Sequence, residues 1–201
     1  MGKLIQIVLA SQSETRKQQL NRIGLEFVSC NPDVDESILT GESADALVSR
    51  LSFNKALAVA GKYNNHLIIA GDQVMSLGKD IIGKPKNTLD AQQHLLNCSG
   101  KIAIFYTGIC VLNSQNNTHF VQVLATKVKF RELNLEIVNK YLKLDFPYSC
   151  AGSIQMESAG MLLVERVYAN DPFAMLGLPI TALNDLFLQH GLNLIDYCFI
   201  T

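Results

Sequence analysis

The chain carries few charges and no concentration of positive ones. Of its 201 residues, 17 are Lys or Arg and 18 are Asp or Glu, giving a net charge of −1, and no basic run occurs. Because affinity for duplex nucleic acid depends mainly on positive charge facing the phosphate backbone, this composition argues against nucleic acid as a partner. A small anionic ligand that is bound by a few local cations is still compatible with the charge balance.

The chain also lacks the spacings of a disulfide framework or a zinc site. Its five cysteines are scattered, none forms Cys-x-x-Cys, and its four histidines are dispersed. Scattered thiols in odd number are typical of a reducing compartment, so we expect the protein in the cytoplasm. No apolar stretch approaches the length of a membrane span. The short run at residues 4–10 contains Gln6 and is interpreted as a first strand rather than as a signal peptide.

Hydrophobic residues make up 48% of the chain, enough for a sizeable core. The clearest predicted element is a helix at 43–60, closed by Gly61, and the clearest buried strand lies at 67–76. The pattern as a whole predicts one domain over residues 1–201 with a mixed α/β fold, antiparallel components and two lobes about a central cleft. The other predicted elements are strands at 4–10, 25–30, 79–82, 101–113, 119–130 and 160–167, and helices that begin at Ser13, Thr88, Asn134 and Pro179.

The apolar run Leu67–Gly71 ends in Asp72, and Gly83-Lys84-Pro85 follows shortly after. Open α/β sheets place their chemistry where strands end. A carboxylate there, with lysines in reach, suggests metal-assisted attack on a phosphate ester. The alternative is an Asp that ends a strand and caps a turn.

Lys55 lies on the apolar stripe of the 43–60 helix, four residues after Leu51 and three before Ala58. Taken on position alone, this favours snorkelling, in which the aliphatic stem is buried and the ammonium reaches water. The other interpretation is an ammonium that points into a cleft. Arg16 and Lys84 are two further candidate cations, and Glu36 in an acidic loop is a second candidate carboxylate beside Asp72.

Ser11 and Ser13 precede a predicted helix, where free N–H groups and the helix dipole favour phosphate, although a Ser at this place is most often a plain cap. The chain has neither Gly-x-x-x-x-Gly-Lys-Ser/Thr nor Gly-x-Gly-x-x-Gly. It is therefore not an ordinary kinase-like or dinucleotide-binding protein.

An ordered set of motifs resembles the Maf family of nucleotide pyrophosphatases. The matching segments run in family order over nearly the whole chain: Leu9–Lys17, Asp33–Glu36, Leu51–Ala56, Ala70–Val74, Gly83–Pro85, Tyr106–Gly108, Ala151–Ser153 and Gly177–Pro179. Asp72-Gln73 and Cys150–Ser153 are similar to the branch that hydrolyses 7-methyl-GTP. The dTTP/UTP branch usually has Asp-Thr and Ala-Gly-Gly-Tyr at these places.

The resemblance implies the Maf or inosine-triphosphatase-like fold, an elongated twisted sheet flanked by helices. It implies hydrolysis of a nucleoside triphosphate to the monophosphate and pyrophosphate, which keeps modified nucleotides out of nucleic acids, with a divalent metal, Mg²⁺ or Mn²⁺. It also implies homodimers, which the family often forms. The residue roles that it implies are catalytic for Asp72, Glu36, Lys55 and Lys84, substrate-binding for Ser11, Arg16, Gln73 and Glu157, and metal-binding for Glu36 and Asp72.

Two other functions stay open at this point. One is a dTTP/UTP pyrophosphatase of the same family, and the other is a nucleotide-binding regulator of cell division with little catalysis. The chain also departs from the family pattern: Glu14 stands where Pro is usual, Lys17 where a second Arg is common, Gly71 where the branch usually has Ser, and Phe53 where a small residue is usual. None of these changes removes a candidate carboxylate or lysine.

Overall fold

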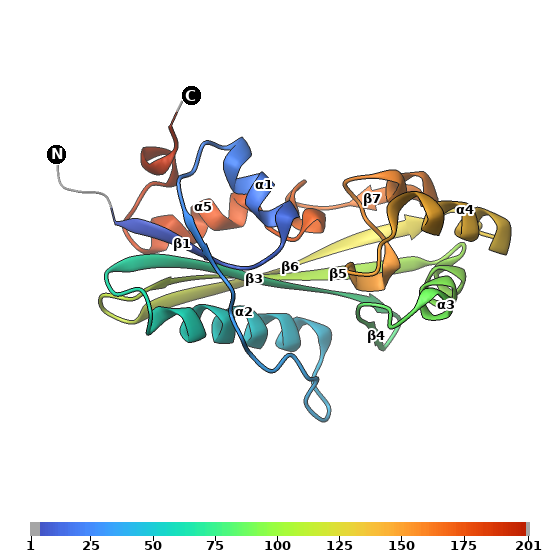
Figure 1. The fold of residues 1–201 in the computed structure, drawn as a ribbon, viewed down its shortest axis with the longest axis horizontal. Helices are drawn as coiled ribbons and strands as arrows, with labels where there is room; N and C mark the ends of the chain where they lie inside the picture. Colours follow the sequence, from blue (N-terminus) through green and yellow to red (C-terminus); the bar gives the residue numbers. More distant parts are fainter. Residues whose placement is uncertain (1–4, 200–201) are drawn as a thin grey trace. The chain divides into compact units, whose positions relative to one another are not determined.

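Strands and helices form a mixed α/β fold along residues 5–199, the part of the chain that the computed structural model describes (Figure 1). The fold divides into two compact units. The first contains the residues up to Asp72, Thr107–Leu124 and the residues from Asp171 onward, and the second contains Gln73–Tyr106 and Ala125–Asn170. These units correspond to the two lobes that the sequence predicts, and the cleft remains a prediction.

Parallel strands begin the first unit. Strand β1 (Gln6–Ala10) pairs in parallel with β2 (Val28–Cys30) and with β3 (His66–Leu77). Two long strands, β5 (Ile102–Asn113) and β6 (Thr118–Phe130), follow in the chain and are joined by a polar turn. Within the described residues, the strand order is β2-β1-β3-β5-β6-β7, with β4 paired to β3.

Helices cover both faces of the sheet in the first unit (Figure 1). On one face, Ile68 and Ala70 of β3 pack with Ala56 and Val59 of α2 (Ala44–Ala60). On the other face, Ile69 packs in a cluster with residues of α1 (Glu14–Arg22) and α5 (Ile180–Gln189). Because successive side chains of a strand point to opposite faces, one apolar run supplies both cores. The short 3₁₀ helices η3 (Ala174–Leu176) and η4 (Leu194–Tyr197) complete this unit.

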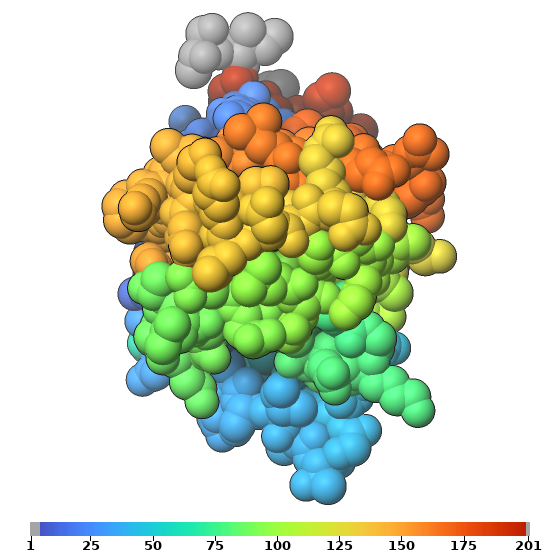
Figure 2. All heavy atoms as spheres, turned by 90° about the vertical axis from the view of Figure 1, so that its right-hand side faces the viewer, coloured from blue at the N-terminus to red at the C-terminus, as the bar shows by residue number. Residues whose placement is uncertain are grey.

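The second unit contains the antiparallel pair of β3 and β4 (Asp80–Ile82), and β7 (Val164–Tyr168), which pairs antiparallel with β6. Its helices α3 (Thr88–Cys98) and α4 (Leu135–Asp145) lie side by side, green and golden yellow in Figure 2. A hydrogen bond of 2.6 Å from Gln92 Nε2 to Asn139 Oδ1 joins them. The 3₁₀ helices η1 (Ala151–Ser153) and η2 (Ala159–Leu163) lie between α4 and β7 in the chain.

Most predicted elements are confirmed, and several boundaries are corrected. The predicted strand 25–30 is regular only from Val28, and the predicted strand 160–167 begins at Val164 because residues 159–163 form η2. The cap of α3 is Asn87, whose side chain accepts from Asp90 N, and Thr88 is the first helical residue. Leu4, the start of the first predicted strand, lies outside the described residues. No helix in the described part of the chain is long and apolar enough to cross a membrane.

The close approach of α2 to β5 depends on Gly108. A Cβ atom at Gly108 would lie 2.4 Å from Val48 O and 2.6 Å from Ser52 Oγ, both on α2. Real Cβ atoms essentially never show such contacts, so any larger residue must push the helix away from the strand. Gly108 is therefore a packing requirement for the helix that carries Lys55.

We expect Gly108→Ala to lower the free energy of unfolding by about 1–3 kcal/mol, the usual cost of overpacking a close-packed interior. Urea denaturation measures this change. Gly61→Ala is the matched control, because the position at the end of α2 has φ −65° and open space around its Cβ. Equal stability of Gly108→Ala and Gly61→Ala would contradict this account of the packing.

Candidate active site

A buried lysine joins two carboxylates in the first unit. Lys55 Nζ lies 2.6 Å from Asp72 Oδ1 and 2.6 Å from Glu36 Oε1. The side chains of Lys55 and Asp72 are only 8% and 10% exposed, whereas that of Glu36 is 48% exposed. The ammonium therefore ends on carboxylates and not in bulk water. The snorkelling interpretation of Lys55 is wrong, and the interpretation as a site residue fits the geometry.

The strand period explains why Asp72 meets Lys55. Asp72 follows Ile68 and Ala70 at intervals of two along β3, so it projects toward α2, the helix that carries Lys55. Asp72 lies inside β3, which continues to Leu77, so the predicted strand at 67–76 is confirmed and the alternative of an Asp that ends a strand is wrong. Asp72 is thus a charged residue within a buried strand. An unpaired charge there would be costly, and the ion pair with Lys55 offsets that cost.

A second cation lies in the same unit at the start of α1. Ser13 caps the helix by accepting a hydrogen bond from Arg16 N, and the guanidinium of Arg16 donates from Nη1 to Ser11 Oγ at 3.3 Å and from Nε to Gly177 O at 2.8 Å. Burial lowers the pKa of Arg16, while the negative charges of Asp72 and Glu36 act in the opposite direction. Ser11, Arg16, Glu36, Lys55 and Asp72 are therefore all brought together in the first unit.

Two buried polar residues that are not among the predicted site residues fix the Gly177 segment: Gln19 holds it against α1, and Asp171 holds it to the start of α5. Gln19 Nε2 donates to Leu178 O at 2.9 Å and to Phe173 O at 3.3 Å. Asp171 accepts from Phe173 N at 2.7 Å and from Thr181 N at 2.8 Å. Gln19 lies three residues after Arg16, on the same side of the helix, and this spacing is the signal that could have identified it.

The structure also shows the surroundings of the residues that depart from the family pattern. Glu14 and Lys17 form an exposed ion pair of 2.6 Å one helical turn apart, so the two unusual residues pair with each other. At Gly71, a Cβ atom would lie 3.0 Å from Gly108 O and 3.7 Å from Arg16 Nε. The missing Cβ thus avoids a tight contact with the carbonyl of Gly108 on β5, whereas the distance to Arg16 is an ordinary contact. Phe53 stacks at a tilt on His119, with 4.3 Å between the ring centroids.

The remaining site candidates, Gln73, Lys84 and Glu157, belong to the second unit. Burial raises the pKa of the Cys150 thiol, the charge of Glu157 raises it further and the charge of Lys84 lowers it, so both charges lie within electrostatic range of Cys150. Gly152 N donates to Gly83 O at 3.0 Å, which ties the Lys84 turn to the segment that leads to Glu157. Lys84 and Glu157, both in the second unit, are therefore a second pair of candidate residues.

A strained residue holds that segment in shape. Ser153 has φ +60°, a left-handed conformation that non-glycine residues rarely adopt, and it is fully buried. Its hydroxyl lies 2.8 Å from His94 Nδ1 of α3, and burial lowers the pKa of His94. The neutral imidazole is therefore favoured as the hydrogen-bond partner that keeps Ser153 in place.

The donor set in the first unit fits a hard divalent cation. Among the described residues, no group of three or more His, Cys, Asp or Glu side chains could enclose a metal by itself. Mg²⁺ is commonly bound by only one or two carboxylates together with substrate phosphate oxygens and water. Glu36 and Asp72, which meet at Lys55, are such a pair, and the half-exposed Glu36 is open to solvent.

These observations define a mixed α/β protein with paired carboxylates and buried cations at its site, and comparison with known proteins places it more closely. Residues 6–190 match the family described as Maf-like protein. A protein of Pseudomonas fluorescens named 7-methyl-GTP pyrophosphatase is 41% identical over 190 residues, covering 94% of this chain and 99% of the relative. A protein of the same name from Nitrosococcus oceani is 41% identical and covers 92% of this chain and 93% of its own length.

The chain therefore belongs to the Maf-like protein family, as its motifs indicate. Among solved structures, the Staphylococcus aureus Ham1 protein superposes with a TM-score of 0.45 and 19% identity, over 63% of this chain and 72% of that protein. This likeness is too low to carry an argument about fold or function.

Proposed function

We propose that the chain is a nucleoside triphosphate pyrophosphatase that hydrolyses 7-methyl-GTP to 7-methyl-GMP and pyrophosphate and so keeps a modified nucleotide out of nucleic acids. The observation that carries the proposal is the buried Lys55 shared by Asp72 and Glu36. Relatives about 40% identical over nearly the whole chain carry the name of this activity. A binding protein without catalysis would have no need of a buried carboxylate such as Asp72.

In the proposed reaction, water attacks the α-phosphorus, a new P–O bond forms, and the bond to the bridging oxygen of the pyrophosphate breaks. The main obstacle is electrostatic, because the nucleophile approaches a polyanion. Lys55, Arg16 and Lys84 bind the triphosphate and offset its charge, and Ser11 contributes a hydroxyl beside Arg16. Asp72 orients the water and accepts its proton, since its carboxylate is buried and fixed by Lys55.

Glu36 and Asp72 are the residues that would hold a divalent cation, Mg²⁺ or Mn²⁺. When bound, such an ion neutralises phosphate charge and acts as a Lewis acid. Lys55 then has a second role, because its ammonium keeps the two carboxylates together before the substrate arrives. Without the ammonium of Lys55, the carboxylates of Glu36 and Asp72 would repel each other, because both lie 2.6 Å from the same nitrogen atom.

Glu157, with Gln73 and Arg16, is proposed to select the base. A carboxylate can accept hydrogen bonds from the N1–H and the exocyclic amine of guanine, and it suits the positive charge of an N7-methylated base. We also propose that the protein acts in the cytoplasm, in keeping with five free cysteines, and as a homodimer, the form that the family often takes.

The substrate assignment is tested by measuring pyrophosphate release from 7-methyl-GTP, GTP, dTTP and UTP with Mg²⁺ or Mn²⁺ and with a chelator. We expect metal-dependent release that is fastest with 7-methyl-GTP. Release from dTTP and UTP alone would support the proposed reaction but would contradict 7-methylguanine as the base that the protein selects. Tight nucleotide binding without release from any of the four would favour the regulator of cell division instead.

Asp72→Asn should lower turnover by roughly a hundredfold or more, because it keeps the size of the side chain and removes the proton acceptor. Nucleotide binding, measured by calorimetry, should persist. Asp80→Asn is the matched control, since Asp80 is an exposed residue of β4. Turnover close to that of the control would move the base away from Asp72, most plausibly to Glu36.

Glu157→Gln should reduce the preference for 7-methyl-GTP over UTP, because it removes a charge-assisted interaction of on the order of 1.5–3 kcal/mol. The ratio of kcat/KM for the two nucleotides measures this preference. Glu165→Gln, at an exposed position of β7 in the same unit, is the control. An unchanged ratio in Glu157→Gln would exclude Glu157 from base selection.

A further inference from the structure

The loop that carries Glu36 is not held in place by apolar packing. Residues 31–39 have no regular secondary structure, and Ile38 and Leu39 are 53% and 56% exposed. A cavity of about 500 Å³ lies between the loop and the flank of α2. Asp35, Ser37, Leu39 and Arg50 are among the residues that line it. Since ordering a flexible loop costs conformational entropy, other contacts must offset that cost.

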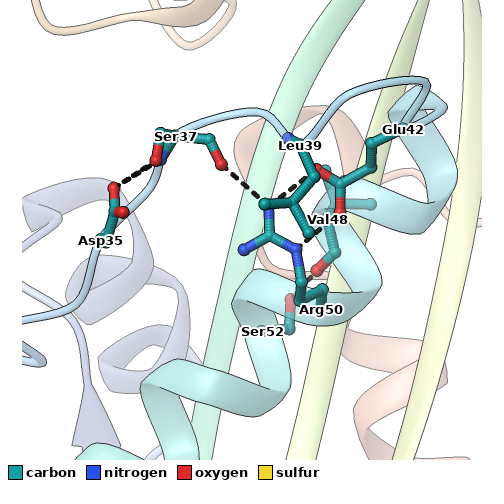
Figure 3. A network of polar contacts seen from close by, with 7 residues as sticks. All are labelled: Asp35, Ser37, Leu39, Glu42, Val48, Arg50 and Ser52. Atoms are coloured by element: carbon teal, nitrogen blue, oxygen red, sulfur yellow. Dashed lines mark hydrogen bonds and ion pairs between the residues drawn. The ribbon is translucent and has the colours of Figure 1, made fainter.

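Arg50 of α2 supplies these contacts (Figure 3). Its guanidinium donates from Nε to Glu42 Oε1 at 2.6 Å and from Nη2 to Glu42 Oε2 at 2.7 Å, a bidentate pair. The same Nη2 donates to Ser37 O at 2.9 Å, and Glu42 Oε2 also accepts from Leu39 N at 3.0 Å. Arg50 thus holds the loop directly at Ser37 and, through Glu42, at Leu39.

The backbone on either side of Glu36 is fixed as well. Asp35 Oδ1 accepts from Ser37 N at 2.9 Å and from Ser37 Oγ at 2.6 Å, which closes a tight turn (Figure 3). Glu36 is the residue between these two in the sequence. Because Arg50 holds the carbonyl of Ser37, it holds this turn against α2. Lys55, the partner of Glu36, stands five residues further along the same helix.

We propose that Arg50, together with Glu42, is the positioning residue that holds Glu36 at Lys55 and Asp72. The inference rests on the proposed function, in which Glu36 is a metal ligand. The pair is charged throughout the neutral range: the hydrogen bond from Arg50 lowers the pKa of Glu42 to about 2, and Glu42 raises the pKa of Arg50. Lysine cannot replace this arginine, because a single ammonium lacks the planar fork that reaches both carboxylate oxygens and the carbonyl.

The test uses Arg50→Lys and Glu42→Gln, with Glu136→Gln as the matched control. Glu136 forms an exposed ion pair with Lys140 on α4, in the second unit. The first readout is the Mn²⁺ concentration at half-maximal pyrophosphate release, which should rise about fivefold or more in both loop variants while KM for the nucleotide changes little. The second is amide hydrogen exchange at Ser37 and Leu39, which should become faster. The thermal midpoint of each variant identifies any variant that fails to fold.

A double-variant cycle separates positioning from general destabilisation. If Arg50 acts through Glu36, then Arg50→Lys should have little further effect on turnover in a Glu36→Gln background. An equal loss in both backgrounds, an unchanged Mn²⁺ response, or unchanged exchange at Ser37 and Leu39 would overturn the proposal. If wild-type protein releases no pyrophosphate, the proposed function fails, and the exchange measurement still decides whether Arg50 fixes the loop.

Discussion

The structure of the first unit depends on one buried ion pair. Lys55 and Asp72 are both nearly inaccessible to water, and their separation of 2.6 Å offsets the cost of burying each charge, with Glu36 as a second partner of Lys55. This pair joins the main helix α2 to the central strand β3, two residues after Ala70 of the apolar cluster on the same face. Gly108 lets α2 lie close to the neighbouring strand, and Arg50 fixes the loop with Glu36 to the same helix. Two residues of the polar site, Lys55 and Asp72, thus stand on a helix and a strand, and the loop with Glu36 is joined to the same helix.

The two units divide the candidate chemistry. The first gathers the buried cations and the two carboxylates, with Gly177 O and Ser11 as partners of Arg16. The second places Lys84 and Glu157 around Cys150, on segments joined by the Gly152–Gly83 hydrogen bond and by the strained Ser153. A glycine at position 153 would adopt that backbone without strain, and here the hydrogen bond to His94 offsets the cost. The left-handed backbone at position 153 is therefore stabilised here by a side-chain hydrogen bond and not by a glycine.

Much of this was predictable from the sequence, because strong local signals coincide with the final structure. The helix at 43–60, the strand around Leu67–Ala70 and the site residues Asp72 and Glu36 follow from periodicity and from the ordered motifs. The boundary errors arise where backbone context decides the outcome. A carboxylate is rare within a buried strand, so the sequence left open an Asp72 that ends its strand, and the ion pair with Lys55 makes the buried position acceptable.

Arg50 shows what sequence reasoning misses. Along the helix it resembles any partly exposed arginine, and its partners Ser37 and Glu42 lie 13 and 8 residues earlier in a loop without periodicity. Gln19 is similar, because its partners lie more than 150 residues away. The spacing from Arg16 places Gln19 on the same side of α1, but its partners are set by tertiary structure and no local pattern identifies them.

The central claim is that the site directs water to the α-phosphorus of a nucleoside triphosphate. It is tested most directly by running the reaction of 7-methyl-GTP in ¹⁸O-labelled water and locating the label by mass spectrometry. Attack at the α-phosphorus places one ¹⁸O in 7-methyl-GMP and none in pyrophosphate, which is the result that the account predicts. Label in pyrophosphate and none in the monophosphate would mean attack at the β-phosphorus and would contradict it.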